Sequence, residues 1–158
     1  MKRLIEVLPY YLNHKLRFKH FDAERDRISI CRIAQFADEE VVLFDGEREY
    51  FEKVQDIKPI LLPLSSIIER QEDRKTPIYE MSGYNGLFLK AGCGYDHEKK
   101  CFYATFQVID EYIKYEVPSD YTTIKMIDAE YLFKHHFDVF GLIESGQAID
   151  KRTISRFT

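Results

Sequence analysis

Residues 28–54, ISICRIAQFADEEVVLFDGEREYFEKV, decide the fold of the first half of the chain. Apolar side chains fall mostly on one face of an extended segment at residues 28–36, which predicts a β-strand. A short apolar run at residues 41–44 ends in Asp45-Gly46, the strongest short-range signal for a hairpin turn. Residues 49–54 then return as a strand. The stretch therefore predicts three antiparallel strands in sequence.

A further strand is predicted before this stretch and an extended segment after it. Residues 16–21 alternate apolar and basic side chains, as a half-buried strand does. The charged residues 22–27 form the turn that follows. Residues 58–65 contain two prolines and cannot form a helix interior, so we expect an extended apolar segment over the core. The N-terminal half is thus expected to be a four-stranded meander or a small barrel.

The second half shows β signals again and ends in a helix. Residues 87–91, 101–108 and 112–117 are expected strands of a second hairpin or meander. A last helix is predicted to begin at Asp128 as its N-cap and to end near Gly141. Its apolar face would carry Ala129, Leu132, Phe133, His136 and Phe137. Strands in runs, with helices at the margins, indicate an α+β fold.

The chain of 158 residues suits one domain, residues 1–158. An apolar content of 45% excludes a disordered chain. Residues 72–75 are all charged and are followed by Thr76-Pro77, so residues 72–77 are a possible seam. It would divide a β-rich unit, residues 1–71, from a unit of strands and a helix, residues 78–158.

Targeting signals are weak. Glu6 and Pro9 interrupt the apolar run at the N-terminus, and no apolar run approaches the ~20 residues of a membrane span. Three cysteines are an odd, sparse set rather than a disulfide framework. We therefore expect a cytoplasmic protein with no membrane partner.

Catalytic and metal-binding motifs are missing. The sequence lacks a phosphate-binding Walker motif and a Gly-x-Ser-x-Gly elbow. Cys93, His97 and Cys101 lack the spacing of a zinc site. We therefore expect no metal, no cofactor and no catalytic residue. A small enzyme of unknown reaction stays as an alternative, with His136 and Asp138 as its only candidates, because Asp138 could orient the imidazole ring.

Charge is distributed unevenly along the chain. The net charge of -4 combines +4 in residues 1–20 and +3 in residues 151–158 with -11 in residues 21–150. Basic ends on an acidic body can contact phosphates. Arg17 and Lys19 alternate with apolar residues on the first strand, an arrangement that serves single-stranded nucleic acid.

Lys151 and Arg152, in the basic tail, join Arg17 and Lys19 as candidate nucleic-acid contacts. The competing interpretation is that these cations form a solvated strand face or pair with the acidic body. A pI near 5.8 favours the competing interpretation, since nucleic-acid domains are usually basic.

Two segments resemble a known group of proteins. Residues 58–67, KPILLPLSSI, resemble a KPILRPLSDL segment, and residues 136–150, HFDVFGLIESGQAID, resemble a HFDVFGLIEKGLAID segment. Both are similar to small phage and prophage proteins of gut Bacteroidetes. That group has no assigned activity, so the resemblance implies origin and extent only. The chain departs from it with Leu62 in place of Arg and Ser66 in place of Asp.

These features favour a non-enzymatic accessory protein of a phage or mobile element, acting through protein–protein interaction or self-association. The chain holds 11 Tyr and 12 Phe, and aromatic residues are common interface anchors. Phe137, Phe140, Leu142 and Ile143 surround Gly141 and must either complete the core or dock on a partner. A nucleic-acid-binding module is the alternative, and a small-molecule ligand is left open.

Overall fold

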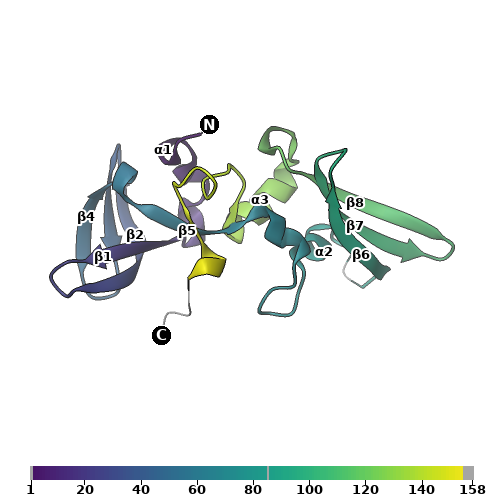
Figure 1. Ribbon diagram of the computed structural model, residues 1–158, viewed down its shortest axis with the longest axis horizontal. Coiled ribbons are helices and arrows are strands. Elements are labelled where there is room, and N and C mark those ends of the chain that lie inside the picture. The colour runs from purple at the N-terminus through teal and green to yellow at the C-terminus, as the bar shows by residue number, and fades with distance from the viewer. Residues whose placement is uncertain (1, 85, 155–158) are drawn as a thin grey trace. The chain divides into compact units, whose positions relative to one another are not determined.

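The first half folds as the predicted antiparallel meander, because its side chains alternate between a buried and an exposed face. In the computed structural model, which describes residues 2–84 and 86–154, four strands follow one another through tight turns (Figure 1). The strands are β1 (Arg17–Asp22), β2 (Arg27–Ala37), β3 (Glu40–Phe44) and β4 (Glu49–Lys53). Each is antiparallel to the next.

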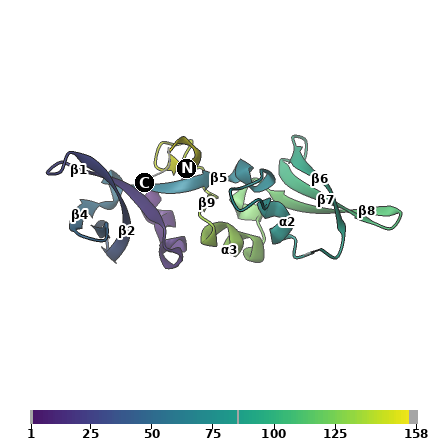
Figure 2. The same cartoon turned by 90° about the horizontal axis from the view of Figure 1, so that it is seen from below.

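The extended segment after the meander is a strand, β5 (Lys58–Pro63), which lies beside β1. Two short strands from the end of the chain, β9 (Phe137–Asp138) and β10 (Ile149–Asp150), run parallel to β5. Figure 2 shows β9 beside β5. The strand order is β10-β5-β1-β2-β3-β4, so the described strands form an open sheet with β4 at one edge.

The core of this unit lies between the sheet and a short helical N-terminal segment. That segment comprises α1 (Leu4–Val7), η1 (Leu8–Tyr10) and η2 (Leu12–His14). The buried cluster consists of Leu4, Val7, Leu8, Tyr11, Leu16, Phe18, Cys31, Val41, Leu43, Val54, Ile57, Leu61, Leu142 and Ala148. Burial of each large apolar side chain contributes about 1.5–3 kcal/mol.

A second, three-stranded antiparallel sheet contains β6 (Leu89–Asp96), β7 (Cys101–Val108) and β8 (Glu111–Pro118). The helical segments η4 (Leu64–Ile68) and α2 (Pro77–Met81) both contact β7. Within the described residues, the remaining helical segments are η3 (Val54–Asp56), η5 (Tyr121–Thr123), α3 (Met126–Lys134) and η6 (Lys151–Thr153). The mixture of antiparallel sheets and marginal helices confirms the predicted α+β class.

The chain divides into two units at positions other than residues 72–77. The first unit contains residues 1–63 and 133–158, and the second contains residues 64–132. Residues 72–77 lie inside the second unit, because the helical segments on both sides of them pack on the same strand. The C-terminal segment returns to the first unit because β9 and β10 pair with β5.

The last helix differs from the prediction at both ends. It begins at Met126, so Asp128 lies in its first turn, is buried, and accepts a hydrogen bond from the Tyr115 hydroxyl instead of capping. It ends at Lys134, because His136 has a φ of 61°, a left-handed conformation that stops a helix. None of the helices in the described part of the chain is long and apolar enough to cross a membrane.

Candidate functional site

The outer face of the first sheet carries basic and aromatic side chains. Along β1, Arg17, Lys19 and Phe21 are exposed, and the residues between them point into the unit. Successive side chains of a strand alternate between its two faces, so these three lie in one row. The structure therefore brings together the two basic candidates of the strand and adds an aromatic ring to them.

Two like-charged pairs lie directly across neighbouring strands. Arg17 of β1 is opposite Arg32 of β2, and Lys19 is opposite Lys58 of β5. All four residues are exposed, and none forms an ion pair within the described part of the chain. Like charges directly opposite on a sheet are destabilising. The arrangement therefore concentrates positive charge that an anionic ligand would neutralise.

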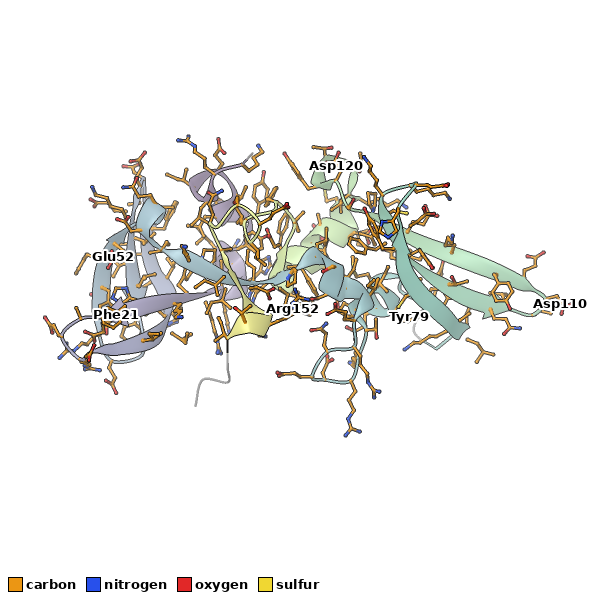
Figure 3. All side chains as sticks on the ribbon, in the orientation of Figure 1. Phe21, Glu52, Tyr79, Asp110, Asp120 and Arg152 are labelled. Atoms are coloured by element: carbon orange, nitrogen blue, oxygen red, sulfur yellow. The ribbon has the colours of Figure 1, made fainter. Side chains whose placement is uncertain are left out.

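Aromatic rings border these cations. Phe21 is 57% exposed and lies opposite Ile28, which is also exposed. The guanidinium of Arg32 lies over the ring of Phe44, 5.4 Å from its centroid. Such a cation–π contact orients the guanidinium. Figure 3 labels Phe21 on this sheet. We define the basic–aromatic face as Arg17, Lys19, Phe21, Arg32, Phe44 and Lys58.

The basic candidates of the tail lie elsewhere in the same unit. Arg152 forms an ion pair with Asp150, with 2.9 Å between its Nη2 and a carboxylate oxygen. Asp150 also accepts the backbone N–H of Arg152 and so caps η6. Lys151 is exposed in that segment, and the last four residues, with Arg156, lie outside the described residues. Arg152 is thus neutralised locally, unlike the cations of the face.

A polar cluster fixes the end of β1 that carries Phe21. The Tyr50 hydroxyl lies 2.8 Å from an Asp22 oxygen and 2.9 Å from an Asp45 oxygen, and it can donate its single proton to one of them at a time. Burial, together with these two carboxylates, raises the pKa of Tyr50 to about 12. Its hydrogen bond lowers the pKa of Asp22, and backbone N–H donors lower that of Asp45.

Two ion pairs join the neighbouring turns beside this cluster. Arg25 pairs with Glu47 at 2.7 Å, and Arg48 pairs with Glu24 at 2.6 Å. Each exposed pair contributes about 0–1 kcal/mol. At neutral pH the tyrosine is protonated and the aspartates are ionised, so no group in the cluster is poised to exchange a proton. The cluster stabilises the turns.

The two candidate catalytic residues, His136 and Asp138, form hydrogen bonds with different parts of the backbone and not with each other. The Nε2 of His136 hydrogen-bonds the carbonyl oxygen of His14, and burial lowers the pKa of His136. Asp138 is buried, and its two oxygens accept the backbone N–H groups of Leu142 and Ile143 at 2.8 Å each. Burial raises the pKa of Asp138, although these N–H donors oppose the rise. The His136 ring thus contacts the N-terminal segment, whereas Asp138 holds the C-terminal loop.

The candidate docking residues of the C-terminal segment belong to the core. Phe137 and Leu142 are buried, while Phe140 and Ile143 are half-buried and pack against the core cluster. The carbonyl of Phe137 accepts the hydroxyl proton of Tyr11 at 2.7 Å. The segment therefore completes its own unit.

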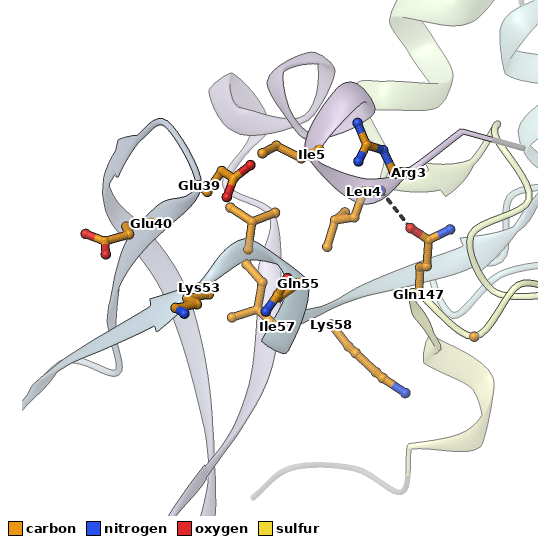
Figure 4. Close-up of a pocket in the computed structure, with 12 residues that line it drawn as sticks. Arg3, Leu4, Ile5, Glu39, Glu40, Lys53, Gln55, Ile57, Lys58 and Gln147 are labelled. Carbon is orange, nitrogen blue, oxygen red and sulfur yellow. Dashed lines mark hydrogen bonds between the residues drawn. The ribbon is translucent and has the colours of Figure 1, made fainter.

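A shallow pocket of about 570 Å³ opens between α1, the β3–β4 region and the C-terminal loop of the first unit (Figure 4). Its charged lining combines Arg3, Glu39, Glu40, Lys53 and Lys58, so both signs are present. It has no cysteine, serine or histidine in its lining. In the described ranges, no three metal-binding side chains gather as a metal site. The pocket does not select one ligand chemistry.

Sequence reasoning missed three members of the basic–aromatic face. Arg32, Phe44 and Lys58 belong to it only because of strand pairing: β1 lies between β2 and β5 in a specific register. The period-two pattern of residues 28–36 could not have shown this, because it groups Arg32 with Ile28 and Ile30 on the apolar face, whereas the structure buries Ser29 and Cys31 and exposes Ile28 and Arg32. Comparisons with known proteins add no relative: no protein-family model, curated protein or solved structure matches the chain.

Proposed function

We propose that the chain is a non-enzymatic binding protein whose basic–aromatic face binds single-stranded nucleic acid. The observation that carries the proposal is that like-charged residues lie opposite each other on neighbouring strands, Arg17 opposite Arg32 and Lys19 opposite Lys58. Phosphates spaced along a backbone would neutralise these four charges and remove their mutual repulsion.

Two features favour a single strand over a duplex. Phe21 offers an exposed ring on a sheet surface, where an unpaired base can stack. The sheet presents a face, whereas duplex recognition usually inserts a helix or a two-stranded ribbon into the major groove. From ideal strand spacing and rise, Phe21 and Phe44 lie about 16 Å apart, which suits a short stretch of nucleotides.

A protein partner is a second candidate, favoured by the tip of the β7–β8 hairpin. Ile109 is 87% exposed there, and Leu89 and Tyr112 are exposed on neighbouring strands. Apolar clusters of this kind often mark protein interaction sites. Because residues 136–150 resemble a segment of phage and prophage proteins, we infer that binding of nucleic acid or of a protein would be an accessory function of a phage or mobile element.

The test is fluorescence anisotropy with a labelled oligothymidine. We expect Arg17→Ala combined with Lys19→Ala to lose about 25-fold in affinity at about 0.1 M salt, because each phosphate contact with a single strand contributes about 0.7 to the salt slope. The slope of log affinity against log salt should fall by about 1.4.

The matched control removes two exposed lysines elsewhere, Lys125→Ala with Lys134→Ala. This variant has the same net charge as the first one and should keep the wild-type slope. Equal losses in both variants would mean that overall charge, rather than the face, governs binding. Absence of binding by the wild type would reject the proposal.

A further inference from the structure

We propose that strand β4 pairs with β4 of a second copy of the chain, antiparallel and centred on Phe51, so that two sheets join into one. β4 is the edge of the first sheet and pairs only with β3 in the described part of the chain. No backbone hydrogen bond from Glu49, Phe51 or Lys53 to a residue outside that pairing is present among the described residues. An unpaired strand edge is a template for another chain.

The outward residues of β4 are self-complementary. Glu49, Phe51 and Lys53 lie on one face in the order negative, apolar, positive. A two-fold axis through Phe51 places Glu49 of each copy opposite Lys53 of the other and places the two Phe51 rings together. Opposite charges and aromatic pairs stabilise cross-strand positions. On the inner face the same register places Tyr50 opposite Glu52.

Within one copy, Phe51 faces Val42 and Glu49 faces Phe44 on β3, so neither has the facing ring or cation that the pairing would supply. Phe51 is 79% exposed, more than any other large apolar side chain in the described part of the first unit. Neither Glu49 nor Lys53 forms an ion pair in that part of the unit, although Glu40 lies opposite Lys53 on β3. A register shifted by two residues would separate the rings and would no longer place Glu49 opposite Lys53.

The edge strand β8 of the second sheet offers a weaker match. Its antiparallel self-pairing would place Lys114 opposite Glu116, but Glu116 already pairs with Lys99 at 3.3 Å. Lys114 already lies over the ring of Tyr103, 4.7 Å from its centroid. Charge complementarity therefore points to β4. The inference uses other residues than the nucleic-acid proposal, although Glu49 lies opposite Phe44 of the basic–aromatic face.

Sedimentation velocity on the full chain, from about 10 µM to about 1 mM, tests the pairing. The wild type should associate to dimers with rising concentration. Glu49→Lys alone and Lys53→Glu alone should each weaken the dimer about tenfold or more, because each places like charges opposite at both ends of the pairing. The same exchange on β8, Lys114→Glu, should leave association unchanged.

Mixing supplies a control for folding. An equimolar mixture of the Glu49→Lys and Lys53→Glu chains should form heterodimers as strongly as the wild type, and the double exchange in one chain should restore its self-association. A wild type that stays monomeric at every concentration would overturn the inference. So would single variants that dimerise as strongly as the wild type.

Discussion

Replacing Phe21 by alanine separates base stacking from charge at the basic–aromatic face. Phe21 is 57% exposed, so its burial contributes to folding less than half of the roughly 3 kcal/mol of a fully buried phenylalanine, about 1 kcal/mol. A base stacked on the ring contributes about 1–3 kcal/mol to binding. Phe21→Ala should therefore weaken oligothymidine binding by about 5- to about 150-fold. The loss should be the same at every salt concentration, because the ring carries no charge.

The neighbour Ile28 provides the matched control. It lies opposite Phe21 on β2 and is also exposed, but it has no ring on which a base can stack. Ile28→Ala should lower stability in urea unfolding by a similar amount and leave affinity nearly unchanged, while Phe21→Trp should restore binding. Equal losses of affinity in Phe21→Ala and Ile28→Ala would refute the stacking argument, as would a change in salt slope on removal of Phe21.

The other predictions concern the stability of the first unit. Tyr11→Phe should lower the free energy of unfolding by about 1–3 kcal/mol, because the buried carbonyl of Phe137 loses its donor; an unchanged urea midpoint would contradict this. Burial lowers the pKa of His136, so the unfolded chain binds its proton first, and stability should fall as pH drops below about 6.5. His136→Asn should reduce that fall, measured by urea unfolding at about pH 7.5 and about pH 5.5; an identical fall in both proteins would show that other groups cause it. Tyr50→Phe should lower the urea midpoint at neutral pH, since the ionised Asp22 loses its hydroxyl donor, and a midpoint equal to the wild type's would show that the cluster is dispensable.

The fold of the first half follows from patterns that are local in the chain. Alternation of apolar and basic residues marks β1, and an apolar run marks β3. Asp45-Gly46 lies in the hairpin turn that follows, with Gly46 at a φ of 100°, a conformation that glycine adopts at little cost. The strand over residues 101–108 was predicted with the bounds that it has as β7. Such short-range signals depend only on neighbouring residues.

Long-range pairing could not be predicted in the same way. Phe133 and Phe137 have helical spacing, yet Phe137 pairs with Leu62 of β5 and lies outside the helix. The same strand places Lys58 beside Lys19, 39 positions earlier in the chain, and so completes the basic–aromatic face. Hydrophobic periodicity alone does not determine which strands that are distant in the sequence pair with each other. The sequence therefore predicted Arg17 and Lys19 but not the charges opposite them.

Ultraviolet cross-linking of an oligothymidine to the full chain, followed by peptide mass spectrometry, tests the central claim most directly because it locates the bound strand. Our account predicts that the cross-linked peptides contain Phe21 and Phe44 and that Arg17→Ala with Lys19→Ala lowers the yield of both when the protein concentration is below saturation. Cross-links confined to residues 64–132, or cross-links at the face whose yield this double substitution leaves unchanged, would contradict it.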